Sequence, residues 1–391
     1  MKVEVINSLA EVGDAEWNRL NCTGDPFVSH QFLYGLELHD CLKPQGWYGT
    51  HVLLRDDDDV LIAAMPLYVR TNSYGEFVFD WAWADAYERA GGRYYPKLVS
   101  AIPFTPATGN RLLVADPADL AVATPALAGA AIELVGHHSA SSLHFLFPND
   151  EQALLFKEQD LLLRAGCQYH WFNRGYENFD AFLQALNSKR RKQIRRERRD
   201  ASAPGISIEV LCGNDITAEH WSVFHEFYCA TFYRKWGEPR LTESFFQYLS
   251  EAMPDVPLLV LGKHDGKYVA GSFSMRGSDT LYGRHWGYSQ HFKLLHFELC
   301  YYQTIEFCID QKLGKFDAGA QGEHKIMRGF DPVKTWSAHW IDDPRLRDAI
   351  AEFLQRETQH IDHYVEELTG HTPYKNLPDF DESIRISDEP G

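Results

Sequence analysis

The sequence predicts an α/β protein made of two similar units, and a pair of matching segments is the main reason. Residues 51–70, HVLLRDDDDVLIAAMPLYVR, have the pattern of a strand, an acidic turn and a second strand. Residues 258–276, LLVLGKHDGKYVAGSFSMR, repeat that pattern. An aromatic segment follows each hairpin, at 77–87 and 281–288, and helical patterns precede both. An internal repeat of this kind indicates two related units joined in tandem.

Local signals place the elements of the second unit. Thr217 is a suitable N-cap for a helix, and Thr242 for another that ends near Pro254. Asp265 and Gly266 form a typical two-residue hairpin turn. The first of the two helices should bury a face made by the following residues: Trp221, Phe224, Phe227, Tyr228 and Phe232.

Composition shifts suggest where the units meet. Residues 178–200 have apolar positions at helical spacing and then become strongly basic, and 345–368 have the pattern of an amphipathic helix. We therefore divide the chain into four parts, and these are 1–177 (first unit), 178–204 (basic connecting helix), 205–344 (second unit) and 345–391 (terminal helix and polar tail).

Bulk properties exclude several classes of protein. The net charge of −17 argues against general nucleic-acid binding by the whole surface. The seven cysteines form no C-x-x-C pair, and the scattered histidines have no ligand spacing, so we expect free thiols and no metal. The alanine-rich window 120–136 contains Pro125 and Glu133 and is expected to be a soluble helix, not an integral membrane segment. With no signal-like N-terminus, we expect a cytoplasmic protein.

Two charged segments stand out. Residues 319–330, GAQGEHKIMRGF, place acidic and basic groups among three glycines. Residues 188–199, SKRRKQIRRERR, hold eight basic residues and one acidic residue. Neighbouring positive charges on a helix repel one another, so an anionic partner would explain such a run. Without one, it would be an ordinary solvated helix face.

Long segments resemble a known family. Residues 80–109, 233–246, 295–307 and 319–332 are similar to signature blocks of the FemAB-like peptidoglycan biosynthesis/recognition proteins, predicted N-acyltransferases of the GNAT superfamily. The resemblance implies two GNAT-like domains in tandem, with mixed central sheets flanked by helices. The Q/R-x-x-G-x-G/A loop that binds the acetyl-CoA pyrophosphate is absent, as is a long coiled-coil insertion. The acyl donor is left open between acyl-CoA and aminoacyl-tRNA.

Acyl transfer to an amine gives the residues of 319–330 possible roles. A base must take the proton of the amine, and positive charge must hold anionic parts of the substrates. We favour Glu323 as the base, with His324 second, and Lys325 and Arg328 as anion-binding groups. Gly319, Gly322 and Gly329 should allow positive φ or a close approach to a ligand. The alternative is a loop ion pair between Glu323 and one of the two cations.

Other residues complete the expected site. Gln321, Gly322 and Trp236 are candidate substrate-binding residues, Trp236 as a pocket wall. Glu298 lies in an apolar helix and is either paired or functional. The basic run could hold an anionic substrate, an acyl carrier, the acceptor end of a tRNA or the surface of a membrane. Its candidate residues for this contact are Lys189, Arg190, Arg191, Lys192 and Arg195. The aromatic residues after the hairpins, with Asp80 and Asp85, are expected in strands and core.

The sequence therefore predicts an N-acyltransferase that moves an acyl or aminoacyl group from an activated carrier to a primary amine, in cell-wall precursor metabolism. Two alternatives stay open. One is an acetyl-CoA-dependent N-acetyltransferase for small molecules. The other is a non-catalytic module that binds cell-wall precursors or anionic surfaces.

Overall fold

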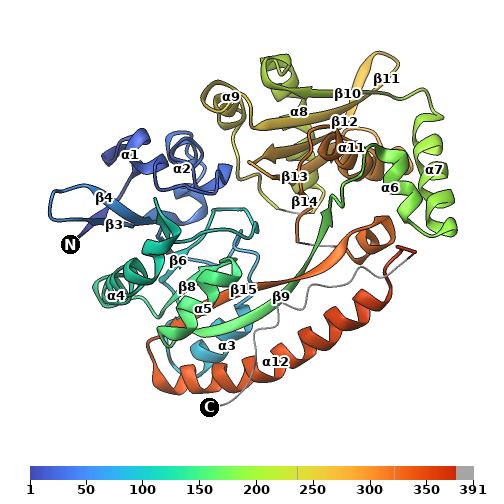
Figure 1. The fold of residues 1–391 in the computed structure, drawn as a ribbon. Coiled ribbons are helices and arrows are strands. Elements are labelled where there is room, and N and C mark those ends of the chain that lie inside the picture. Colours follow the sequence, from blue (N-terminus) through green and yellow to red (C-terminus); the bar gives the residue numbers. More distant parts are fainter. Residues whose placement is uncertain (236, 321, 376–391) are drawn as a thin grey trace.

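The computed structural model describes residues 1–235, 237–320 and 322–375, which contain both strands and helices (Figure 1). The strands are β1 (Lys2–Ile6), β2 (Trp47–Gly49), β3 (His51–Arg55), β4 (Leu61–Met65), β5 (Tyr68–Arg70), β6 (Lys97–Ser100), β7 (Leu113–Val114), β8 (Ser142–Leu146), β9 (Leu162–Phe172), β10 (Ser207–Cys212), β11 (Pro257–His264), β12 (Lys267–Arg276), β13 (Thr280–Tyr288), β14 (Lys315–Asp317) and β15 (Asp331–Ile341).

The α-helices are α1 (Asp14–Asn18), α2 (His30–Leu38), α3 (Trp81–Arg89), α4 (Leu120–His137), α5 (Asp150–Glu158), α6 (Phe179–Ala185), α7 (Ser188–Ser202), α8 (Ala218–Tyr233), α9 (Glu243–Ala252), α10 (Leu295–Phe297), α11 (Gln303–Asp310) and α12 (Pro344–Gly370). A π-helical turn, η6 (Glu298–Tyr302), joins α10 to α11, and a 3-10 helix, η7 (Glu323–Arg328), precedes β15. The 3-10 helix η2 (Pro26–Val28) lies near the N-terminus.

One sheet runs through both halves of the molecule, in the strand order β10-β11-β12-β13-β14-β9-β15-β8-β6-β5-β2. A smaller sheet has the order β1-β3-β4-β7. The two long strands β9 and β15 pair with each other at the centre, and a parallel pair lies on each side of them: β13 with β14, and β6 with β8. This near-symmetric order confirms the tandem α/β fold expected from the repeat.

The predicted hairpins and helix caps are present. Strands β3 and β4 pair antiparallel, as do β11 and β12, and Asp265 and Gly266 both have the positive φ of a tight hairpin turn. The side chains of Thr217 and Thr242 accept backbone hydrogen bonds at the start of α8 and α9. These features depend on neighbouring residues alone.

The halves exchange strands at the centre of the large sheet. Strand β9 follows β8 in the chain but pairs with β14, whereas β15 follows β14 and pairs with β8. Helix α12 lies along both long strands (Figure 1). The sequence pattern placed residues 331–341 within the second unit. In the structure they form β15, which pairs with β8 in the part of the large sheet that belongs to the first half. Much of the predicted polar tail, 376–391, lies outside the described residues.

Two local expectations are wrong. Residues 81–89 form helix α3 instead of a strand, since alternating alanines favour a helix and Trp83 lies on its buried face. Asp80, directly before α3, is buried and pairs with Lys97. The basic segment is two helices, because the Asn187 side chain accepts a hydrogen bond from the Arg190 amide and starts α7 afresh.

Helix α4 is part of the packed fold. In the described part of the chain, residues 117–137 alone form a helix long and apolar enough to cross a membrane, by length and composition. Leu120, Leu127, Ala131 and Val135 nevertheless lie in a core cluster with β3 and β8 residues. The helix therefore covers the sheet of the first half.

Candidate functional site

The parallel strands β13 and β14 separate soon after they meet. They pair at only three positions, ending with Tyr282 opposite Asp317. Beyond that point β13 continues to Tyr288 while paired with β12 alone, and residues 284–286 are half-buried. The chain after β14 turns into segment 318–330, so this segment begins where the two strands diverge.

Glycines shape that segment as the sequence predicts. Gly319, Gly322 and Gly329 all have positive φ, which ordinary residues rarely adopt. Gly329 is also tightly packed, because an added Cβ would lie 2.9 Å from the ring of Phe182. Helix η7 starts after Gly322 and ends at Gly329, so the glycines fix where its charged side chains leave the backbone.

Lys325 points into the protein beside the diverging strands. Its side chain is 1% exposed, and Nζ donates to the backbone oxygens of Ala318 and Gly319, at 2.8 and 2.6 Å. Burial lowers the pKa of Lys325 to about 8, although nearby Asp317 opposes that shift. An amine that titrates near neutral pH in a buried position is typical of a functional group.

Arg328 also points inward, but it meets a carboxylate. Its Nη2 lies 2.9 Å from one oxygen of Glu197 on α7, and its guanidinium stacks 3.5 Å from the centre of the Phe297 ring. Tyr302 and Gln193 donate to the same carboxylate. This buried ion pair ties helix α7 to the glycine-containing segment.

Glu323 and His324 lie nearer the surface. The hydroxyl of Tyr364 on α12 donates to Glu323 Oε1 at 2.6 Å. His324 Nε2 lies 3.0 Å from the hydroxyl of Tyr301, and its ring packs near Phe297. Burial, helped by Arg328 and Lys325, lowers the pKa of His324, so its ring is neutral at neutral pH.

The side chains of Glu323, His324, Lys325 and Arg328 therefore have four different partners. Lys325 and Arg328 are buried, whereas His324 and Glu323 are exposed and Glu323 is held by Tyr364 of α12. Among the described residues, the loop ion pair between Glu323 and Lys325 or Arg328 is not formed. The catalytic and binding roles assigned to these residues stay predictions. Gln321 and Trp236 lie outside the described residues.

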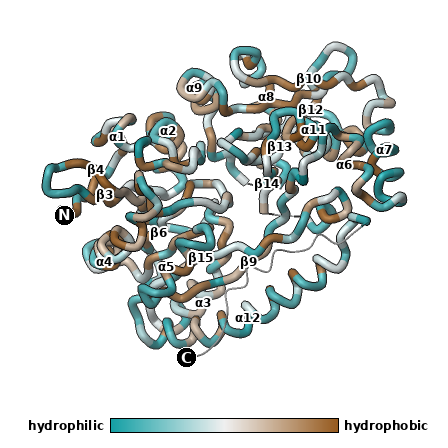
Figure 2. The backbone as a smooth tube through the Cα atoms, in the orientation of Figure 1, coloured by the Kyte–Doolittle hydropathy of each residue, from teal (hydrophilic) through white to brown (hydrophobic). Residues whose placement is uncertain are grey.

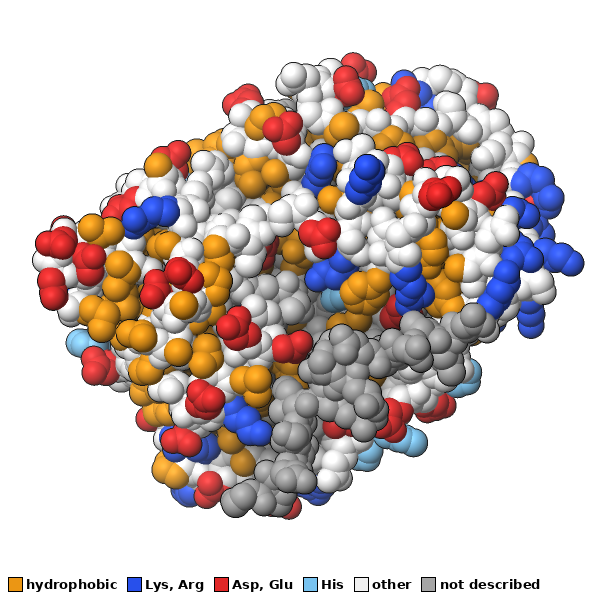
Figure 3. All heavy atoms as spheres, in the orientation of Figure 1, with side chains coloured by type: hydrophobic (Ala, Val, Ile, Leu, Met, Phe, Trp, Pro, Cys, Tyr) orange, Lys and Arg blue, Asp and Glu red, His pale blue; other side chains and the backbone are white. Residues whose placement is uncertain are grey.

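The basic helix α7 has an inner and an outer face. Glu197 and Arg198 face the protein, and Arg198 pairs with Glu298. Glu298, which the sequence predicted to be either paired or functional, is therefore paired. Arg195 pairs with Asp180 near the surface. Most residues of α7 are hydrophilic (Figure 2), and Lys and Arg side chains gather on the surface over the helix (Figure 3). The exposed basic residues there include Lys189, Lys192, Arg195, Arg196 and Arg199.

Arg190 and Arg191 lie in the first turn of the same helix. Both are half-buried, and their guanidinium groups contact Gln193 and the backbone oxygen of Leu186. Of the five candidates from the sequence, Lys189, Lys192 and Arg195 are therefore the best placed to meet a partner.

Sequence reasoning missed several titratable groups near the diverging strands. Asp317 is buried, 3.6 Å from His170 on β9, and burial lowers the pKa of His170 to about 4. Arg284 donates to the backbone oxygen of Phe104 in the first half, and burial lowers its pKa to about 10. His296 packs beside Trp286. No local pattern marks these residues, since strand pairing brings them together.

The chain is a tandem α/β fold whose parallel strands β13 and β14 diverge beside the buried Lys325. A model of the FemAB-like family, described as peptidoglycan biosynthesis/recognition, matches residues 8–376. The chain belongs to this family. Family and fold together support a transferase of the acyltransferase type. Among proteins with curated descriptions, none matches the chain.

Solved structures share the fold at low sequence identity. FemX superposes with a TM-score of 0.54 and 13% identity, over 90% of this chain and 100% of that one. The C-terminal domain of a putative lysylphosphatidylglycerol synthetase from Agrobacterium fabrum gives 0.55 and 10%, over 89% and 96%. L-PGS from Bacillus licheniformis gives 0.50 and 11%, over 86% and 97%. At such identities the likeness shows the fold alone.

Proposed function

We propose that the protein is an N-acyltransferase that moves an acyl or aminoacyl group from an activated carrier to a primary amine of a cell-wall precursor. The observation that carries this proposal is the buried Lys325 amine, next to a neutral histidine, at the divergence of β13 and β14. Membership of a peptidoglycan biosynthesis/recognition family supports the choice of precursor.

His324 and Lys325 divide the chemistry between them. A neutral imidazole can take the proton that the attacking amine loses, and the exposed ring of His324 is held by the hydroxyl of Tyr301. Lys325, as a cation, stabilises the negative oxygen that develops on the acyl carbonyl. Glu323, the base favoured by the sequence, is the second candidate, and its carboxylate is oriented by Tyr364.

Helix α7 would hold the anionic part of a substrate. Lys189, Lys192 and Arg196 are exposed on its outer face, and among the described residues they have no ion-pair partner. Both donors left open by the sequence, acyl-CoA and aminoacyl-tRNA, carry phosphates that such a face attracts.

A transfer assay with paired variants tests the function. The protein is incubated with acetyl-CoA or with an aminoacyl-tRNA pool and a set of primary-amine acceptors, and mass spectrometry detects acylated product. We expect His324→Gln to lower kcat/KM by about 10² to 10⁴, and Glu323→Gln to leave most of the activity. Loss in Glu323→Gln alone would move the base role to Glu323. If no acylated product forms with acetyl-CoA or with aminoacyl-tRNA, the proposed acyltransferase activity is refuted.

Charge on the outer face of α7 should control the binding of a polyanion. Replacing Lys189, Lys192 and Arg196 with glutamine should reduce the slope of log affinity for tRNA against log salt concentration by about 2 to 3. Fluorescence anisotropy at several salt concentrations measures this slope. A charge-matched control replaces three exposed lysines elsewhere, Lys267, Lys293 and Lys312. An equal loss in both variants would contradict a specific role for α7.

A further inference from the structure

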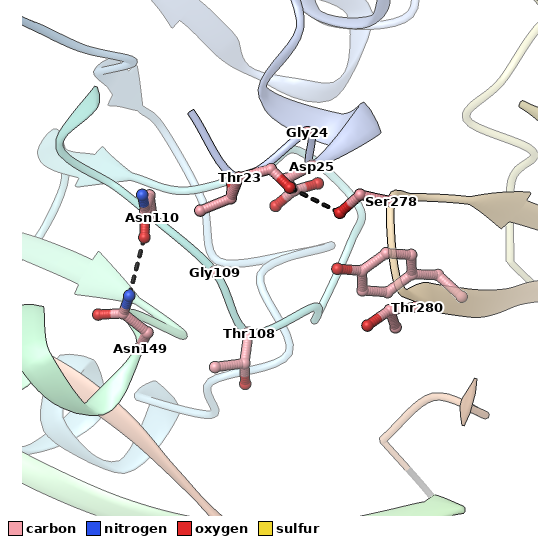
Figure 4. A pocket seen from close by; sticks show the side chains of 10 residues that line it. Thr23, Gly24, Asp25, Thr108, Gly109, Asn110, Asn149, Ser278 and Thr280 are labelled. Atoms are coloured by element: carbon pink, nitrogen blue, oxygen red, sulfur yellow. Dashed lines mark hydrogen bonds between the residues drawn. The ribbon is translucent and has the colours of Figure 1, made fainter. Parts of the chain in front are cut away.

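A polar cavity lies at the seam between the two halves, and none of the described residues of segment 319–330 lines it (Figure 4). Its volume is about 190 Å³. The residues that line it are Thr23, Gly24, Asp25, Thr108, Gly109, Asn110, Asn149, Ser278, Thr280 and Tyr282. The hydroxyl of Ser278 donates to the backbone oxygen of Thr23, which bridges the halves at the rim. The volume is below the range of drug-sized pockets, so a ligand must be small.

Asp25 is the charged side chain of this cavity, and one of its oxygens has no partner. Oδ1 accepts the Phe27 amide and caps the short helix η2. Oδ2 has no hydrogen-bond donor among the described residues, although the side chain is only 5% exposed. A buried carboxylate oxygen without a donor costs stability. Capping alone therefore does not explain this residue, and a hydrogen-bond donor in the cavity would.

Burial is the largest influence on the charge of Asp25. Arg111 and Lys315 act on it as cations and Asp317 as an anion, and burial outweighs them and raises the pKa of Asp25. The guanidinium of Arg111 is fixed by the backbone oxygens of Ala107, Asn110 and Leu146, so it cannot turn to Asp25 and bond with Oδ2. Arg111 therefore places positive charge near Asp25 but gives no hydrogen bond to Oδ2.

The rest of the wall consists of neutral groups that both donate and accept. The hydroxyl of Thr108 also has no hydrogen-bond partner in the described part of the chain. Thr280 and Tyr282 bring hydroxyls from β13, and Asn110 is linked to Asn149 by an amide hydrogen bond. Hydroxyls and amides around one carboxylate match a ligand with several hydroxyl groups.

We infer that this cavity binds a small, uncharged polyhydroxylated ligand about the size of one sugar ring, with Asp25 accepting its hydroxyl hydrogens. The ligand would touch Asp25, Thr108 and Asn110 from one half, and Thr280 and Tyr282 from the other. This site goes beyond the proposed transfer reaction and does not depend on it.

Ligand-observed NMR titration tests the site without any acyl donor. The probes are D-glucose, N-acetyl-D-glucosamine and myo-inositol, with n-butylammonium as a charged comparison. At least one polyol should bind, and Asp25→Asn should weaken it by about tenfold or more, because a hydrogen bond to a charged acceptor is lost. Tyr282→Phe, which keeps the ring packed on Phe27, should weaken it several-fold.

Asp116→Asn is the matched control. Asp116 caps another 3-10 helix that starts with proline, as Asp25 does, but it is exposed and outside the cavity. This variant should bind polyols like the wild type. The inference is overturned if no polyol binds, if only n-butylammonium binds, or if Asp25→Asn and Tyr282→Phe both retain wild-type affinity.

Discussion

Arg328→Met should lower the free energy of unfolding by about 3 to 5 kcal/mol, because it leaves the Glu197 carboxylate buried without its cation. The two side chains are 5% and 7% exposed, and their closest atoms are 2.9 Å apart. Most of this loss in stability comes from Glu197, whose charge stays buried without either water or a cation. The lost attraction between the two ions contributes less, because it had been offset by the cost of removing both from water. Urea denaturation at neutral pH, followed by circular dichroism, measures the change.

A second substitution separates these two contributions. Adding Glu197→Gln to Arg328→Met removes the stranded charge, so the double variant should recover part of the lost stability. The glutamine can still accept the hydrogen bond that Tyr302 gives to Glu197. If the loss of unfolding free energy in the double variant equals the sum of the losses in the two single variants, the buried charge of Glu197 is not what destabilises Arg328→Met.

The control is a surface pair on the same helix. Arg195 and Asp180 are 2.9 Å apart but 53% and 72% exposed. Exposed ion pairs contribute about 0 to 1 kcal/mol, so Arg195→Met should change little. A similar small effect for Arg328→Met would mean that the Glu197–Arg328 pair does not hold α7 against segment 319–330.

The contrast between these pairs also shows what the sequence could predict. The basic run was recognisable, but nothing in it indicated that Glu197 would pair with Arg328, 131 residues away. Helix caps at Thr217 and Thr242, the turn at Asp265 and the positive φ of the three glycines depend on local geometry, and all were predicted. Such features need only a few neighbouring residues to form.

Features that depend on distant pairing were beyond local reasoning. Strands β9 and β15 are far apart in the sequence, and no local sequence pattern predicts that they pair. The same pairing sets Asp317 next to His170, and it places Asp25 near β13 to close the polar cavity. Glycine and charge content marked segment 319–330 as unusual, but they did not indicate that Glu323 would turn toward α12.

Lys325→Met should reduce kcat/KM for acyl transfer by about 10² to 10³, the effect expected when one group that stabilises an oxyanion is removed. Since only the cation can do this, wild-type kcat/KM should fall as pH rises through about 8, the pKa of Lys325. The variant should lose that descending limb. The transfer assay described for His324 supplies both measurements, and Lys334→Met, which removes a surface pair with Asp362, is the control lysine.

Stability gives a test of Lys325 that needs no substrate. Its pKa falls from 10.5 in the unfolded chain to about 8 in the folded protein, so between these values the unfolded chain binds more protons and wild-type stability gains as pH rises. The full penalty of burying the cation, about 3 kcal/mol, applies below the folded pKa. Lys325→Met lacks this penalty. Its stability relative to wild type should therefore decrease by about that amount from pH 8 to 10.5, which denaturant titrations at several pH values would measure. A constant difference across that range would mean that Lys325 is not buried as a titrating cation, and its role at the site would fail with it.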